Sequence, residues 1–386
     1  MSLLTKTAML LLPLLVAGCV TVDRTSPSAL SGDVVRDGAD LAERAPKKDK
    51  VLWLFRTASA AMHRARFAEA KAPLDEAIQT IEGIFGPDKS ARRARSHFGR
   101  EAQKTFIGEP YERVMAYYYR GILYWMDGEP DNARACFRSA QIHDGDADDK
   151  TYAADYVLLD YLDGLASVKT TGDGTAALQR AQSHTAQGSL PAYDKNANVI
   201  FFVEYGNGPT KYAAGQHQEM LRFRKGNSTT QSATITVNNQ SAVLKPLDDL
   251  YYQATTRGSR VIDHILAGQA RFRETTDSIG NAALITGAVL ATQQKRRSSV
   301  DEIGAGLLLF GLASKLIAGA TNPTADTRSW DNLPQYLSFT ALKVPPGQHT
   351  AAVDFLDASG QSRKKKSVSF TVIDPSKDIV IFLSDK

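Results

Sequence analysis

Residues 115–140 read MAYYYRGILYWMDGEPDNARACFRSA and decide the first half of the fold. Apolar side chains recur at three- and four-residue spacing on both sides of Asp127-Gly128, which is typical of amphipathic helices. Glycine is favoured just after a helix ends, and proline is favoured in the first turn of a helix, as at Pro130. The stretch therefore predicts two helices joined by a tight turn.

Six residues of this stretch follow the spacing of a known helical repeat. They are Tyr117, Gly121, Tyr124, Ala133, Phe137 and Ala140. The pattern resembles the tetratricopeptide repeat (TPR), a helix pair of about 34 residues. In this resemblance Gly121 lets the two helices approach, Ala133 is the small residue that it meets, and aromatic rings fill the remaining space.

A single repeat cannot bury both of its faces, so the resemblance implies neighbouring hairpins. Leu54–Ile84 and Tyr156–Ala181 carry weaker forms of the same spacing. We therefore expect an irregular array of TPR-like helical hairpins over residues 51–190. An unrelated helical bundle is the alternative.

Four large apolar side chains share one face of the first helix of the hairpin. They are Met115, Tyr118, Ile122 and Trp125. In the TPR family this face lines the concave groove, so the resemblance implies that these residues bind a protein partner. Aromatic stripes at helical spacing are also common in hydrophobic cores, so burial under another part of the chain is the alternative.

The pattern changes from helical to β-rich near residue 196. Strands are expected at 199–203 and 233–237, and Asn238-Asn239 is typical of a hairpin turn. Four more strands are expected at Tyr336–Leu342, His349–Leu356, Ser367–Ile373 and Ile379–Leu383. Because turn residues separate them at regular intervals, they predict an antiparallel sheet or small sandwich.

The predicted fold class is therefore α+β. An N-terminal helical-hairpin (TPR-like) array precedes an α+β domain, residues 191–386, that ends in an antiparallel β-sheet, residues 335–384. Arg328 and Trp330 lie at the entry to this sheet, and we expect them to lock it onto the helices.

Residues 279–320 form a glycine-rich apolar helical hairpin in the predicted α+β domain. Its segments are Ile279–Ala291 and Ile303–Ala320. Small residues allow close packing of helices in a bilayer or at an oligomer interface. The first segment is too short to span a bilayer, and Lys315 is costly in lipid, so buried core helices are favoured.

At the amino terminus, a basic start and an apolar run precede Leu15-Val16-Ala17-Gly18-Cys19. This order is typical of a signal peptide, and the small pair before the cysteine resembles the lipobox of bacterial lipoproteins. The resemblance implies removal of residues 1–18 and lipidation of Cys19, which anchors the protein to a membrane. Residues 19–50 are then a flexible, lipidated tether. Val20 in place of aspartate favours the outer membrane, and we expect the periplasmic side.

Charge and motifs argue against enzymatic or nucleic-acid chemistry. The chain of 386 residues has a net charge of +4, which is too small to indicate a nucleic-acid partner. Known zinc-protease, nucleophile-elbow and phosphate-loop motifs are missing from the sequence. The acidic stretch 143–149 has Asp149 at the position where the sharp turn of a calcium loop needs glycine. We therefore expect no catalytic residues, no metal and no cofactor.

A basic run, Arg363-Lys364-Lys365-Lys366, follows the predicted turn at Ser359-Gly360. A solvated hairpin flank that discourages edge aggregation explains it most simply. Contact with anionic lipid headgroups or a cell-wall polymer is the alternative.

These observations predict a membrane-anchored lipoprotein that acts as a non-enzymatic protein–protein interaction adaptor in cell-envelope assembly. One alternative is a subunit of a membrane-inserted oligomer that uses residues 279–320. The other is an envelope hydrolase whose site is assembled from residues distant in sequence. The oligomeric state is not predicted.

Overall fold

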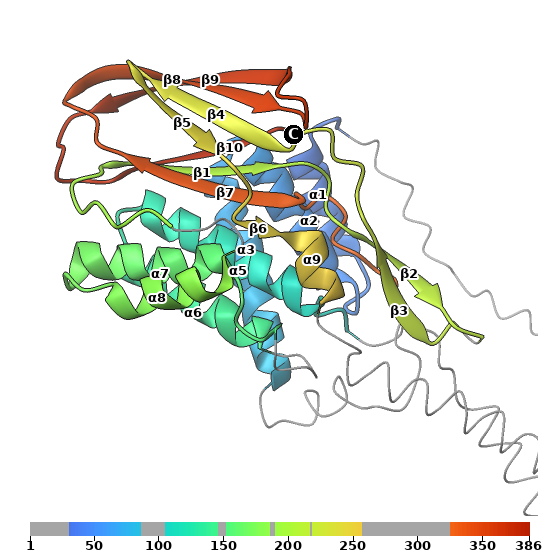
Figure 1. The fold of residues 1–386 in the computed structure, drawn as a ribbon. Coiled ribbons are helices and arrows are strands. Elements are labelled where there is room, and N and C mark those ends of the chain that lie inside the picture. Colours follow the sequence, from blue (N-terminus) through green and yellow to red (C-terminus); the bar gives the residue numbers. More distant parts are fainter. Residues whose placement is uncertain (1–30, 86–104, 146–151, 186–189, 217, 257–324) are drawn as a thin grey trace, which may run out of the picture.

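A computed structural model describes residues 31–85, 105–145, 152–185, 190–216, 218–256 and 325–386. In these ranges a layer of helices covers one face of a mixed β-sheet, and the other face of that sheet packs on a second sheet (Figure 1). The predicted α+β fold class is confirmed.

The helical layer is built mainly from consecutive antiparallel helices. They are α1 (Val34–Arg44), α2 (Lys50–His63), α3 (Phe67–Phe85), α5 (Pro110–Met126), α6 (Pro130–Asp144), α7 (Val157–Thr170) and α8 (Thr175–His184); the short α9 (Leu250–Thr255) comes later in the chain. Neighbouring helices in sequence are also neighbours in space, as expected when connections are short.

The hairpin of α5 and α6 forms where the sequence predicts it. Gly128 ends α5 with a φ of +80°, a conformation that side chains other than glycine rarely adopt. Gly121 lies against α6, and a Cβ atom added there would come within 2.5 Å of the Phe137 ring. The nearest neighbour of Gly121 is therefore Phe137 and not the expected Ala133, because the ring fills the space that the missing side chain leaves.

Ten strands of the described residues form two four-stranded sheets and a ribbon. The central sheet has the order β10-β1-β7-β6, the outer sheet has the order β5-β4-β8-β9, and β2 pairs with β3 in the ribbon. The strands are β1 (Val199–Tyr205), β2 (Thr210–Ala214), β3 (Met220–Arg224), β4 (Ser232–Val237), β5 (Gln240–Leu244), β6 (Asp248–Asp249), β7 (Tyr336–Leu342), β8 (Gly347–Leu356), β9 (Ser362–Val372) and β10 (Ile379–Ser384).

Strand β1 is buried on both faces because it lies between two layers. Successive side chains on a strand point to opposite faces. Phe202 thus packs in the core shared with the helices, whereas Phe201 packs in the core between the two sheets. The run of apolar residues in β1 therefore indicates its central position in the molecule.

The segment before β7 fastens the sheets to the helices, as the sequence predicts for Arg328 and Trp330. The Arg328 guanidinium donates to the Asp49 carboxylate at 2.6 Å and to the Lys48 carbonyl at 3.0 Å, both at the start of α2. The Trp330 backbone N–H donates to Glu112 of α5 at 2.7 Å, and its indole N–H donates to Ser59 of α2 at 2.9 Å. Arg328 therefore binds the start of α2, and Trp330 joins α2 to α5, which is distant from it in sequence.

The four predicted C-terminal strands all form, but they do not make one antiparallel sheet. β8 and β9 extend the outer sheet, whereas β7 and β10 flank β1 in the central sheet. β10 is parallel to β1, with Phe202 opposite Phe382. Of the two expectations, the single antiparallel sheet over 335–384 is not formed, because β1, from the middle of the chain, separates β7 from β10; the two sheets that share a core agree with the small sandwich.

The boundary expected near residue 190 marks a change from helices to strands. One hydrophobic core nevertheless crosses it, since Tyr118 and Trp125 of α5 share a cluster with Ile200 and Phe202 of β1. The two halves of the described chain are thus packed as one unit.

Candidate functional site

The face of α5 that a TPR groove would present is covered by the protein itself. Met115, Tyr118 and Ile122 are fully buried, and Trp125 is 1% exposed. Tyr118 and Trp125 each lie edge-on to Phe202 of β1, with ring centroids 6.1 and 6.3 Å apart. The expectation that these four residues bind a partner is therefore not met, because the central sheet occupies that surface.

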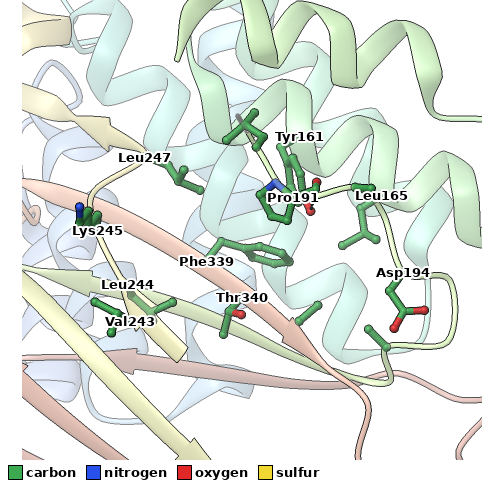
Figure 2. A pocket seen from close by; sticks show the side chains of 14 residues that line it. Tyr161, Leu165, Pro191, Asp194, Val243, Leu244, Lys245, Leu247, Phe339 and Thr340 are labelled. Atoms are coloured by element: carbon green, nitrogen blue, oxygen red, sulfur yellow. Dashed lines mark hydrogen bonds between the residues drawn. The ribbon is translucent and has the colours of Figure 1, made fainter. Parts of the chain in front are cut away.

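A pocket of about 250 Å³ lies between α7 and the β7 side of the central sheet. We call it the α7–β7 pocket (Figure 2). Its walls are mainly apolar, and its polar lining residues are few. Representative lining residues are Tyr161, Leu165, Pro191, Val243, Leu247 and Phe339. Such a pocket fits an apolar side chain better than a charged one.

Two ordered contacts hold the wall of this pocket in place. The Tyr161 hydroxyl donates to the Pro191 carbonyl at 3.1 Å, and burial raises the pKa of Tyr161 to about 12. The Tyr193 ring packs so closely on Gly164 of α7 that a Cβ atom there would lie within 1.9 Å of the Tyr193 oxygen. The segment after α8 is therefore fixed onto α7.

The floor of the pocket is one side of strand β7, and this side is open. β6 pairs only with Tyr336 and Leu337 of β7. Among the described strands, none pairs with the rest of that side of β7. Phe339, Thr340 and Ala341 all line the pocket, so the unpaired stretch of strand is accessible from it.

The direction of the backbone groups on this open side follows from the hydrogen bonds around it. The Leu337 carbonyl accepts from the Leu247 N–H on the β6 side at 2.8 Å, and the Leu342 carbonyl accepts from the Asn198 N–H on the β1 side at 3.0 Å. Backbone groups alternate in direction along an antiparallel strand. The N–H and C=O groups of Phe339 and Ala341 therefore point to the open side.

The rim of the α7–β7 pocket carries an exposed apolar residue. Val243 of β5 lines the pocket, yet 67% of its surface is exposed. Lys245 and Asp194 supply the charged part of the rim. An open strand edge next to an apolar pocket is the arrangement with which proteins bind extended peptides, because the edge supplies hydrogen bonds and the pocket supplies selectivity.

Buried ionic groups elsewhere have a structural role. Glu204 of β1 is fully buried and accepts a hydrogen bond from the Tyr119 hydroxyl at 2.7 Å, and His63 Nε2 lies 2.7 Å from its other oxygen. In the described residues, neither Glu204 nor His63 lines the α7–β7 pocket. This buried group joins α2, α5 and β1 beneath the surface.

A second buried ion pair joins Glu112 of α5 to Lys211 of the β2–β3 ribbon at 2.5 Å. The side chains are 0% and 1% exposed, respectively. Glu112 also accepts the backbone N–H groups of Glu109 and Trp330, both at 2.7 Å. Several partners thus compensate the carboxylate for its loss of water.

The acidic stretch that resembles a calcium loop begins at the end of α6 with His143 and Asp144, and residues 146–149 lie outside the described residues. Within the described ranges, no group of three or more His, Cys, Asp or Glu side chains has the arrangement of a metal site.

Some sequence predictions fall outside the described part of the chain. These are the signal peptide, Cys19 and the glycine-rich hairpin 279–320. Within the described part, none of the helices has the length and apolar character that crossing a membrane requires.

The α7–β7 pocket was missed by the sequence analysis. Its lining comes from α7, the segment after α8, the end of β5 and strand β7. The alternating pattern of Tyr336–Leu342 predicts a strand, but periodicity gives no information about which edge of that strand is left unpaired. No local signal could therefore have located the site.

No known protein family, no curated protein and no solved structure matches this chain.

Proposed function

We propose that this chain is a lipid-anchored, non-enzymatic adaptor of the cell envelope that binds an extended segment of a partner protein. Cys19 is its anchor, and the outer membrane, on the periplasmic side, is its location. The proposal combines the lipobox pattern of the sequence with the binding surface on the folded body.

The open edge of β7 beside the α7–β7 pocket is the observation that carries the proposal. The partner segment would pair with the backbone of Phe339 and Ala341 as an added strand. An apolar side chain of that segment would enter the pocket between Tyr161 and Leu165. An unpaired edge is otherwise a site of aggregation, so a dedicated partner gives a reason for leaving it open.

The helical half has a supporting role in this proposal. We infer that α5 and α6 are a TPR-like hairpin, which the close approach of Gly121 to Phe137 supports. Their inner face holds the central sheet in the position where a TPR groove would hold a peptide. The partner therefore binds at the sheet edge instead of the helical groove.

Photo-crosslinking from the pocket rim tests this function. A photoreactive amino acid at Val243, 67% exposed, is compared with one at Ile142, 74% exposed, on α6 and outside the pocket. In intact envelopes Val243 should crosslink to one defined segment of one protein, mapped by mass spectrometry. Equal crosslinking from both positions would contradict the proposal.

A proline substitution tests the role of the strand edge. The Ala341 N–H points to the open side, so Ala341→Pro removes an edge donor without removing a bond to β1, and proline is tolerated on edge strands. The variant should stay folded and lose the Val243 crosslink. The matched change Thr340→Pro removes a bond to β1 and should destabilise the protein. An unchanged crosslink in Ala341→Pro would show that the edge is not used.

A further inference from the structure

A second hollow, of about 1350 Å³, adjoins the α7–β7 pocket. We call it the strand-end cleft, since it lies where β1 begins, β7 ends and β10 begins. The turn between α5 and α6 forms its opposite wall. Ala197 lines both hollows, so the two are adjacent.

The floor of this cleft is held by a buried network. The Trp125 indole N–H donates to one Asp378 carboxylate oxygen at 2.8 Å. The Lys169 ammonium donates to the other oxygen at 2.6 Å and also to the Ala197 carbonyl at 2.6 Å. Asp378 is therefore neutralised by Lys169, and both side chains are at most 15% exposed.

Three further lysines of the cleft have no such partner. Lys195, Lys343 and Lys377 are exposed and lie on three separate segments around the opening. None of them forms an ion pair with a carboxylate in the described ranges. The remaining acidic residue of the lining, Asp127, is paired with Lys71 at 2.7 Å. The pKa of Asp374, just outside the lining, is lowered by hydrogen bonds from Ser376 and also by the nearby charge of Lys377, but no carboxylate of the lining is left to offset the three lysines.

The basic run 363–366 differs from these three lysines because its side chains have hydrogen-bond or ion-pair partners. Arg363 pairs with Asp357, and Lys365 lies 3.6 Å from Asp354. Lys364 and Lys366 donate to the backbone oxygen of Lys386. Each of these side chains already has an acceptor. The basic side chains of β9 thus have acceptors, whereas Lys195, Lys343 and Lys377 of the cleft form no ion pair in the described ranges.

We propose that the strand-end cleft binds acidic residues of the same extended partner segment whose apolar side chain enters the α7–β7 pocket. This inference rests on the proposed function. A chain paired with the edge of β7 runs past Ala341 toward Lys343, because both belong to the same segment. Carboxylates that follow the apolar anchor then meet the three lysines. The partner is therefore an apolar–acidic linear segment.

The direct test uses fluorescein-labelled poly-L-glutamate as the probe and the full mature chain in detergent. The variant Lys195→Gln/Lys343→Gln/Lys377→Gln is compared with Lys47→Gln/Lys225→Gln/Lys365→Gln, which removes the same charge from exposed sites elsewhere. Fluorescence anisotropy should show binding that weakens about tenfold in the cleft variant and less than about twofold in the control. Binding should also weaken with added salt.

The Val243 crosslink separates this inference from the proposed function. The inference predicts that the crosslink to the partner falls about tenfold in the cleft variant and is retained in the control. A crosslink that is unchanged in the cleft variant overturns the inference and leaves the proposed function standing. Absence of the crosslink in the wild type overturns the proposed function. Binding of polyphosphate without binding of poly-L-glutamate would also overturn the inference, since the cleft would then recognise phosphate.

Discussion

Trp330 stacks on Phe55 with ring centroids 4.2 Å apart and an interplanar angle of 18°. Phe55 belongs to α2, near the start of the described chain, and Trp330 belongs to the segment that leads into β7. Both side chains are almost fully buried. This stacked pair is one of the contacts that fix the sheet edge with its pocket relative to the helices.

Truncation of Trp330 should therefore loosen the joint between the layers. Trp330→Ala removes a buried indole and its hydrogen bond to Ser59, and should lower the free energy of unfolding by about 3–5 kcal/mol. Urea unfolding followed by circular dichroism measures this. Trp53→Ala is the control. Trp53 is a half-buried residue of α2, so its truncation should lower the free energy of unfolding clearly less.

The inner face of α5 gives a second prediction. Because Tyr118 and Trp125 are core residues against β1, Tyr118→Ala and Trp125→Ala should each destabilise the protein by about 3–5 kcal/mol. Tyr124→Ala, on a half-buried residue covered by the Arg120 guanidinium, should cost less. Stable variants that lose only partner binding would instead restore the groove hypothesis.

The contact between Gly121 and Phe137 gives a third prediction. Gly121→Ala places a methyl group where the Phe137 ring lies, so it should destabilise the protein by about 1–3 kcal/mol. Phe137→Leu removes that ring, and the double variant should then be more stable than the sum of the two single changes predicts. Strict additivity of the two effects would show that the helices are not in close contact there.

Asp248 predicts a pH dependence of stability. Its carboxylate accepts the backbone N–H groups of Val157 and Leu158 at the start of α7, at 3.0 and 2.9 Å. Burial, together with the charges of Asp155 and Asp144, raises its pKa from 3.8 to about 7. The folded protein therefore binds more protons than the unfolded chain between about pH 4 and about pH 7.

The sign follows from this difference in bound protons. The free energy of unfolding should fall as the pH rises through that window, with a slope of up to about 1.4 kcal/mol per pH unit from this group. Asp248→Asn cannot ionise and should remove that part of the slope, even though one acceptor oxygen is lost. Urea titrations at several pH values compare the two proteins, and an identical slope in both would contradict the assignment.

The proposed lipid anchor predicts that replacing Cys19 removes the protein from the outer-membrane fraction. Wild-type protein should carry acyl chains on Cys19 by intact-mass analysis, because more than one chain is needed for stable anchoring. Cys19→Ser should lack them and leave the outer-membrane fraction. An unmodified wild-type mass would rule out the anchor.

The sequence predicts those parts of the fold that depend on local pattern. The turn at Asp127-Gly128 and the strand Tyr336–Leu342 were both located correctly, since turn chemistry and alternation are local signals. The sequence also predicts that Arg328 and Trp330, at the entry to the last sheet, lock it onto the helices, and their contacts with α2 and α5 agree with this.

Pairing between distant strands could not be predicted in this way. Nothing in Ile379–Ser384 indicates a parallel partner such as β1, far earlier in the chain. The stripe on α5 shows the same difficulty. Its periodicity correctly identifies a face that must be covered, but periodicity does not say whether a partner or the chain's own sheet covers it.

The candidate site was not predictable because it depends on the unpaired edge of β7, and a sequence pattern does not show which edge of a strand lacks a partner. The pocket arises because β6 begins only at Asp248, opposite Leu337, while β7 continues to Leu342. The exposed lysines of the cleft are individually unremarkable in the sequence, and only the fold brings them together.

The order β10-β1-β7-β6 also has a consequence for how the chain matures. β1 is synthesised long before either of its neighbours in the central sheet, and β10 is the last of the described strands to emerge. Until β7 and β10 emerge, β1, which packs on the aromatic face of α5, has neither of its neighbours in the central sheet, and sheets that depend on such remote pairing form slowly. A nascent chain therefore exposes the unpaired edges of β1 during this interval, and unpaired strand edges of this kind favour aggregation or binding by a chaperone.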